Sequence, residues 1–316
     1  MFSHDLAYKQ LENGESVLAT VHFPPSRVPQ PYTVAYHGGG FVIGSRAMIP
    51  EAQVRHLTEA GVVVVSADYR LCPQLSLYEG PIQDAKDAYL WSRNILPGIL
   101  KEDFDIKADR SSMLAFGHSA GGLLALHLGT LPEPPRAITD FYGTKYTNDP
   151  FWVTPLPALA MLPDFDAAYL NKIFDEPIIS NTMTSLEQTA SARPTTKIVG
   201  MPKPDLSIVR NAWLFDGLKR GTHLRAIVQD GDYKRIDPVS MFSHSFPPTF
   251  FVHGESDDMV PTSFSEQAYA ELLKLGVETG ISLAEGKSHG FDAGMDSDDP
   301  AFKSVLAGLD FLIKRK

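Results

Sequence analysis

The sequence has one cysteine, no surplus of basic residues and no long apolar run. With Cys72 alone, an intrachain disulfide and any zinc site built from several cysteines are excluded. The sequence has 28 Lys and Arg and 38 Asp and Glu. Because this net negative charge disfavours binding to a phosphate backbone, we expect no nucleic-acid partner. The longest aliphatic run, VVVV at 62–65, is strand-sized, so we expect no membrane span. The start, MFSHDLAYKQ, lacks the features of a secretory signal, and we expect a cytoplasmic protein.

Short apolar segments alternate with helical patterns along most of the chain. The segments are rich in β-branched or aromatic residues and are bounded by glycine, proline or polar residues, which is typical of buried parallel strands. They are YTVAY (32–36), GVVVVSA (61–67), SMLAFG (112–117), AITDFYG (137–143), PTFFVHG (248–254) and a short strand around GISLAE. Helical patterns fall at 52–60, 81–96, 120–131, 263–276 and 300–314. This alternation predicts an α/β fold with a mostly parallel, doubly wound sheet.

The alternation stops between Thr144 and about Phe246. That stretch holds many prolines and aromatic residues and two amphipathic segments, 164–175 and 205–219. A structureless loop of this length is improbable in a compact domain, so we expect it to carry its own helices and to act as a lid. The predicted division is a core made of residues 1–143 and 247–316 and a cap at 144–246.

Two glycine-rich motifs follow predicted strands. GHSAGG at 117–122 fits the pattern G-x-S-x-G and opens into an apolar helix, which makes Ser119 a candidate nucleophile on a sharp strand-to-helix turn. Side chains at the two flanking glycine positions would clash in such a turn. HGGGF at 37–41 places three consecutive glycines directly after YTVAY. Ordered glycines indicate a positive φ or a backbone that another group must approach closely.

Six motifs together resemble the hormone-sensitive-lipase-like branch of the α/β-hydrolases, the carboxylesterases and their relatives. In the family's order they are HGGGF (37–41), DYRL (68–71), GHSAGG (117–122), DPVS (237–240), HGESDDMVP (253–261) and SHGF (288–291). The resemblance implies an α/β-hydrolase fold and an acyl-transfer site, without specifying the substrate. It also implies, position by position, that the backbone N–H groups of Gly39, Gly40 and Ala120 form an oxyanion hole for a tetrahedral intermediate.

The base and the acid follow from the family's chain order of serine, acid and histidine. His289, in KSHGF, is the histidine that remains after the HGESDD turn. Glu255, Asp257 and Asp258 all follow the strand TFFV, and the family pattern HGxxDxxVP implies Asp257, with Asp258 as the alternative. A metal site at this turn is disfavoured because no other ligand cluster supports it. We expect neither a metal nor another cofactor.

Residues around the motifs are candidates for a substrate pocket. Phe41, Trp152 and Trp213 would line an acyl or alcohol pocket, although aromatic residues in a cap equally form its own core. His118 stands where the commonest family motif, GDSAGG, has an aspartate. It either shapes the site or is an exposed neighbour of the turn. We expect a small-molecule ester or acyl substrate. The sequence does not decide whether the protein forms a homodimer.

The predicted function is hydrolysis of a carboxylic ester, lactone or thioester of a small to medium hydrophobic substrate through an acyl-enzyme. Other classes stay open. An acyltransferase, cyclase or C–C condensing enzyme would pass the same acyl group to an acceptor other than water. A non-catalytic receptor would hold a ligand in the same pocket, but receptors that resemble this family lose the histidine that is present here. A peptidase is less favoured, because nothing suggests a propeller or a peptide-gating domain.

Overall fold

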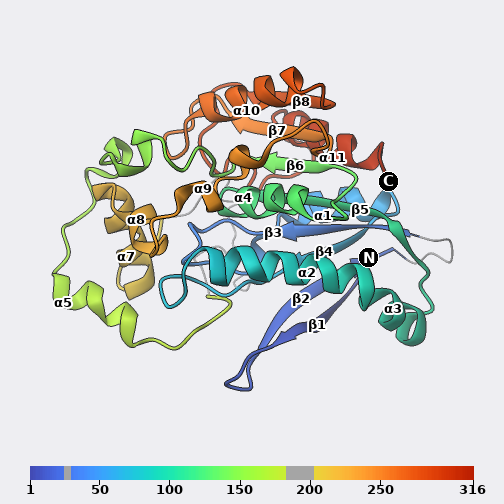
Figure 1. The fold of residues 1–316 in the computed structure, drawn as a ribbon, viewed down its shortest axis with the longest axis horizontal. Coiled ribbons are helices and arrows are strands. Elements are labelled where there is room, and N and C mark those ends of the chain that lie inside the picture. The colour runs from blue at the N-terminus through green and yellow to red at the C-terminus, as the bar shows by residue number, and fades with distance from the viewer. Residues whose placement is uncertain (25–29, 183–202) are drawn as a thin grey trace.

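An eight-stranded sheet runs through the protein, whose computed structural model describes residues 1–24, 30–182 and 203–316 (Figure 1). Its strands are β1 (Phe2–Gln10), β2 (Ser16–Phe23), β3 (Gln30–Tyr36), β4 (Val63–Ala67), β5 (Ala108–His118), β6 (Ile138–Phe141), β7 (Thr249–Gly254) and β8 (Thr279–Ala284). The helices are α1 (Glu51–Glu59), α2 (Gln83–Asn94), α3 (Leu96–Phe104), α4 (Ala120–His127), α5 (Ala167–Leu170), α7 (Val209–Arg220), α8 (His223–Ile227), α9 (Tyr233–Ile236), α10 (Thr262–Lys274) and α11 (Phe302–Ile313).

The strand order in the sheet is β1-β2-β4-β3-β5-β6-β7-β8. From β4 to β8 every neighbouring pair is parallel, whereas β1 pairs with β2, and β2 with β4, in the antiparallel sense. The predicted mostly parallel sheet is therefore confirmed. The antiparallel edge formed by β1 and β2, and helix α3, were not predicted.

Helices cover both faces of the sheet because the strands are apolar on both sides. In β4, Val63 and Val65 pack into one layer and Val64 packs into the other, as the two-residue period of a strand requires. Helices α2, α3, α4 and α10 contribute buried residues or packed neighbours to the first layer, and α1 and α11 contribute to the second. The arrangement is the doubly wound one that the alternation predicts.

The carboxyl ends of the parallel strands lie at one edge of the sheet, so the loops that follow them meet there. The glycine-rich stretch His37–Gly40 follows β3, Ser119 follows β5, and Tyr142 follows β6. The turn that contains Asp257 follows β7, and His289 follows β8. Five loops that are far apart in sequence are thus brought to one place.

The chain between β6 and β7 supplies helices α5, α7, α8 and α9. Helices α5, α7 and α8 lie beyond the carboxyl ends of the strands, at the left of the view in Figure 1. Backbone bonds tie this stretch to the glycine-rich side of the sheet: Leu71 N–H donates to Ile179 O at 2.8 Å, and Thr182 N–H donates to Gly44 O at 2.9 Å. Residues 183–202 of the predicted cap lie outside the described residues.

Membrane-spanning length is not reached by any helix in the three described ranges, since none is both long and apolar enough to cross a bilayer.

Candidate active site

Ser119 lies on a sharp turn between β5 and α4 and has strained backbone angles, φ 53° and ψ −115°. Two glycines make this turn possible. A Cβ at Gly117 would overlap the carbonyl of Gly121, and a Cβ at Gly121 would overlap the carbonyl of Tyr36. Ser119 N–H donates to Phe141 O at 2.9 Å, which fixes the turn to the neighbouring strand. The close packing predicted for the two flanking glycines is therefore present.

The three glycines after His37 bring main chain next to this serine. An added Cβ at Gly38 would lie 3.3 Å from Ser119 Cβ. Gly39 has φ 108° and Gly40 has φ 58°, values that L side chains rarely adopt, and a Cβ at Gly40 would meet Leu214 Cδ1 at 2.7 Å. Ala120 is the first residue of α4, so its N–H belongs to the first turn, where backbone donors have no partner inside the helix.

His289 connects the serine to a carboxylate. Its Nε2 lies 2.9 Å from Ser119 Oγ, and its Nδ1 lies 2.7 Å from Asp257 Oδ2. Asp258 and Glu255, the other carboxylates of the same turn, are exposed. The structure therefore brings Ser119, His289 and Asp257 into one hydrogen-bonded series. In the sequence, Ser119 and His289 are 170 residues apart, and Asp257 and His289 are 32 residues apart.

The Asp257 side chain is fully buried, yet it is held as a carboxylate. Burial alone would raise its pKa, but the contacts with His289 and His253, which act as hydrogen-bond donors to the carboxylate, outweigh burial and lower the pKa below the usual range. Asp257 Oδ1 also accepts the N–H groups of Met259 at 2.8 Å and Val260 at 2.9 Å. The acid thus has fixed partners on both oxygens.

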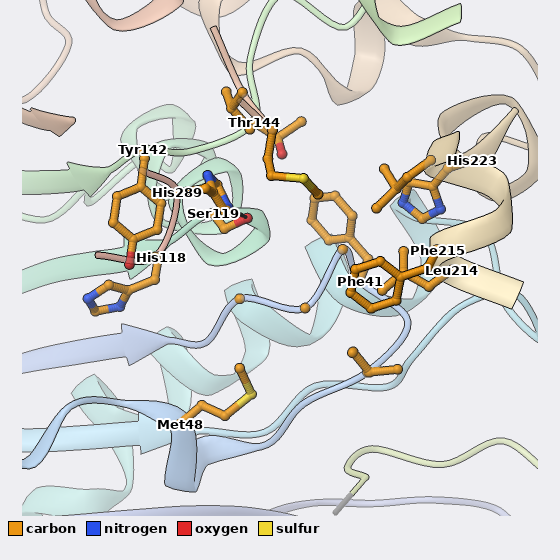
Figure 2. Close-up of a pocket in the computed structure, with 18 of the residues that line it drawn as sticks. Phe41, Met48, His118, Ser119, Tyr142, Thr144, Leu214, Phe215, His223 and His289 are labelled. Atoms are coloured by element: carbon orange, nitrogen blue, oxygen red, sulfur yellow. Dashed lines mark hydrogen bonds between the residues drawn. The ribbon is translucent and has the colours of Figure 1, made fainter. Parts of the chain in front are cut away.

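An apolar cavity of about 150 Å³ opens onto Ser119. In Figure 2, Ser119 and His289 lie on one side of it and Leu214, Phe215 and His223 on the other. Its lining includes Phe41, Met48, Pro50, Thr144, Trp152, Leu218 and Met259. Trp213 is not among the described lining residues; it packs edge-to-face on Phe174 and on His223, with ring centroids 6.3 and 6.1 Å apart. Of the predicted pocket residues, Phe41, His118 and Trp152 therefore line the cavity and Trp213 does not.

His118 is buried and belongs to a polar network that the sequence reasoning missed. Its Nε2 lies 3.0 Å from Asp292 Oδ2 and 3.1 Å from Gln53 Oε1, and Tyr142 Oη–H donates to Asp292. The Tyr142 ring also contacts His289, with centroids 4.8 Å apart. The network ties the histidine loop to the serine turn. A histidine where the family usually has aspartate was the signal that an acidic partner lay elsewhere.

Metal binding has no support in the ranges described: no three or more His, Cys, Asp or Glu side chains there are grouped so that they could hold an ion.

Three buried histidines should make the fold sensitive to acid. Burial lowers the pKa of His37, His127 and His223 from 6.5 to about 4. Because the unfolded chain binds these protons near pH 6.5 and the folded chain binds them only near pH 4, the free energy of unfolding must fall as the pH decreases through that window. At pH 5 each histidine is expected to cost about 2 kcal/mol relative to pH 7.5.

Urea unfolding at pH 7.5 and pH 5.0 measures this loss. His127→Gln is expected to reduce the difference between the two free energies of unfolding by the contribution of one histidine, about 2 kcal/mol. Equal free energies of unfolding at the two pH values in the unsubstituted protein would contradict the prediction.

Comparison with known proteins agrees with the observed fold. Residues 33–136 match the family described as alpha/beta hydrolase fold, and residues 219–313 match the prolyl oligopeptidase family. An α/β-hydrolase superfamily protein from Enterococcus faecalis superimposes with a TM-score of 0.66 at 19% identity, covering 100% of this chain and 99% of that one. Together with the strand order, these matches show that the chain has the α/β-hydrolase fold. The resemblance and the fold class predicted from the motifs are confirmed.

Further comparisons point to two kinds of similar protein. Esterase 2 of Thermogutta terrifontis, in its apo form, has a TM-score of 0.62 at 19% identity and covers 99% of this chain and 94% of that one. Among curated proteins, the non-reducing polyketide synthases adrD of Penicillium rubens and ausA of Aspergillus calidoustus are 30% and 32% identical over 95% of this chain. The chain spans 13% of the length of each synthase.

Proposed function

We propose that this α/β-hydrolase cleaves an acyl ester or thioester through an acyl-enzyme on Ser119. The observation that carries the proposal is the series Ser119 Oγ to His289 Nε2 at 2.9 Å and His289 Nδ1 to Asp257 Oδ2 at 2.7 Å, at the opening of an apolar cavity. A nucleophile, a base within hydrogen-bond reach and a group that orients the base are the parts that acyl transfer requires. The superfamily and the esterase neighbour support the same reaction class.

In the proposed reaction, Ser119 Oγ attacks the acyl carbonyl while His289 Nε2 takes its proton. Gly39, Gly40 and Ala120 N–H groups receive the oxygen that becomes negative, a contribution of about 3 kcal/mol for each donor. His289 then gives the proton to the departing alcohol or thiol. Water, activated by the same nitrogen, attacks the acyl-enzyme and releases the acid.

The cavity and the relatives suggest the acyl group. An apolar cavity of about 150 Å³ is enough for one benzene-sized ring. The curated relatives are polyketide synthases, whose products are assembled from acyl units, and the similarity extends over nearly the whole chain. We therefore propose a compact, hydrophobic acyl group of the polyketide type, carried as an ester or a thioester.

Transfer to an acceptor other than water is the second candidate function, and the likeness to biosynthetic proteins favours it. Ser119 and His289 serve hydrolysis and transfer equally, because both pass through the same acyl-enzyme. The two outcomes differ only in which nucleophile reaches that intermediate.

Product analysis tests both candidates. The protein is incubated with p-nitrophenyl esters of graded acyl length and with N-acetylcysteamine thioesters of aromatic acids, with and without an added alcohol or amine. Free acid as the product in both conditions supports hydrolysis, and a new ester or amide supports transfer. Folded protein that turns over none of these acyl donors would refute the proposed function.

Residues 144–246 are proposed to act as a cap that selects the acyl group. Their described part supplies Thr144, Trp152, Leu214, Phe215 and Leu218 to the cavity wall, whereas Ser119, His289 and Asp257 lie outside it. Trp152→Ala is expected to enlarge the cavity and shift the ranking among acyl lengths towards longer chains, with a smaller effect on a short acetate ester. Values of kcat/KM across the ester series measure the ranking.

Trp213→Ala is the matched control, because it removes an equally large, half-buried ring of the same segment that does not line the cavity. The ranking should stay as it is in the unsubstituted protein. A uniform loss over all esters in Trp152→Ala, with normal folding by circular dichroism, would argue against a selective cap.

A further inference from the structure

A second histidine shares the carboxylate of Asp257. His253, the fifth residue of β7, is completely buried, and its Nε2 lies 3.0 Å from Asp257 Oδ2, the oxygen that His289 Nδ1 also contacts. The same Nε2 lies 3.1 Å from the carbonyl oxygen of Val260. Both neighbours are acceptors, so His253 Nε2 must carry a hydrogen.

The contacts continue from the other side of the His253 ring into the core. His253 Nδ1 lies 2.7 Å from Ser265 Oγ, and Lys145 Nζ donates to that oxygen at 3.1 Å. Lys145 Nζ also donates to Gly143 O at 2.6 Å and lies 2.8 Å from Asp140 Oδ2. The side chains of Lys145 and Asp140 are fully buried, so this is an ion pair inside the protein.

The positions of the hydrogens follow from what each group can donate. A lysine ammonium has hydrogens to donate and no acceptor, so Lys145 donates to Gly143 O and to Ser265 Oγ, and its charge is offset by Asp140. Ser265 Oγ therefore accepts from Lys145 and has its own hydrogen left to donate to His253 Nδ1. The His253 ring is then neutral, with its hydrogen on Nε2, and donates to Asp257.

We propose that Lys145, Ser265 and His253 are positioning residues that fix the Asp257 carboxylate for its work on His289. The series runs in one direction, from Lys145 through Ser265 and His253 to Asp257, so it locks one tautomer of His253. With His253 N–H on one side and the N–H groups of Met259 and Val260 on the other oxygen, the carboxylate can only face His289 in one orientation. The role of His289 as the base rests on the proposed function, but the hydrogen-bond series does not.

Simple packing does not explain this cluster. A buried ion pair is costly to desolvate, and apolar side chains of similar volume often give equal or greater stability. The hydrogen-bond series from Lys145 through Ser265 and His253 to Asp257 is here called the relay. Tyr142 does not replace it: the Tyr142 ring lies 6.4 Å from the His253 ring and 4.8 Å from the His289 ring, and its hydroxyl donates to Asp292. The relay thus connects the charged side chain of Lys145 to the carboxylate of Asp257.

The test uses the whole chain labelled with ¹⁵N-histidine, in which ring nitrogen shifts distinguish N–H from bare nitrogen at pH 7.5. His253→Asn assigns the His253 signals by their loss. We expect a bare Nδ1 and a protonated Nε2 in the unsubstituted protein. Ser265→Ala should lose this single pattern, and kcat for the best ester should fall about tenfold with little change in KM, the effect of weakening one charge-assisted hydrogen bond.

Ser92→Ala is the matched control, since Ser92 is also a fully buried helical serine, donates to Ala88 O at 2.7 Å and lies away from the site. It should leave the His253 signals and kcat unchanged. Ser265→Thr, which keeps the hydroxyl, should retain both. If Ser265→Ala does not fold, Lys145→Met combined with Asp140→Asn removes the charged donor together with its counter-charge and should release the His253 tautomer in the same way.

The outcomes separate the two proposals. An unsubstituted protein with the His253 hydrogen on Nδ1 overturns the relay, even if esters are cleaved. A folded Ser265→Ala that matches Ser92→Ala in both signals and kcat also overturns it. If no ester or thioester is cleaved, the proposed function fails, while the nitrogen shifts still decide whether the relay exists.

Discussion

Ser119→Ala is expected to abolish covalent labelling by a fluorophosphonate and to lower ester turnover by a factor on the order of 10⁵ or more. The labelled atom and the acyl carrier are the same oxygen, Ser119 Oγ, which is 2.9 Å from the base that activates it. Alanine keeps the shape of the turn, because the strained angles at this position are supported by Gly117 and Gly121 rather than by the hydroxyl.

Labelling followed by intact mass, and hydrolysis of p-nitrophenyl acetate, measure these effects. Ser256→Ala is a suitable control, because Ser256 is exposed in the loop before Asp257 and its side chain takes no part in the proposed reaction. Full labelling of Ser119→Ala would show that another residue is the nucleophile.

The core of the fold was predictable because its strands are buried on both faces. The runs at 32–36 and 61–67 became β3 and β4 within two residues at each end. The strand β1 was missed because most of its residues are exposed and polar, and its structure depends on pairing with β2. The signal for β2 was present in SVLATVHF, where Val17, Ala19 and Val21 are buried at every second position.

Local motifs and chain order predict the candidate residues of the site. They do not predict which side chains from distant parts of the sequence contact those residues. Ser119, Asp257 and His289 each stand in a short pattern beside a predicted strand end. By contrast, Gln53 and Asp292 are 239 residues apart, and Lys145 and Ser265 are 120 apart. Nothing in the spacing of either pair indicates a contact, because the contact is made by the packing of α1 and α10 against the loops.

Pocket lining was the least predictable feature, since it depends on the rotation of individual helices. Leu214 and Phe215 of α7 face the cavity, while Trp213, one position earlier, lies outside its lining. Successive residues of a helix point in directions about 100° apart. Without the axis of α7, an aromatic residue in this stretch was equally compatible with the cavity and with the interior of the cap.

Asp257→Asn is expected to lower kcat by about 10⁴-fold, while Asp258→Asn leaves it nearly unchanged. Asparagine has one oxygen where aspartate has two. If that oxygen accepts from Met259 and Val260 N–H, the amide nitrogen faces the N–H groups of His289 and His253, and donor meets donor. If the amide is reversed, its nitrogen faces the two backbone N–H groups instead.

His289 avoids this contact between two donors by adopting the tautomer with its hydrogen on Nε2. In that tautomer Nε2 can no longer accept the proton of Ser119. Asp258 makes a matched control, because it is the next carboxylate in the turn and is exposed. Steady-state kinetics on an ester of intermediate acyl length, with fluorophosphonate labelling rates for both variants, measure the difference. A larger loss in Asp258→Asn than in Asp257→Asn would mean that the histidine takes its charge partner from the exposed member of the pair, and the assignment of the acid would then be wrong.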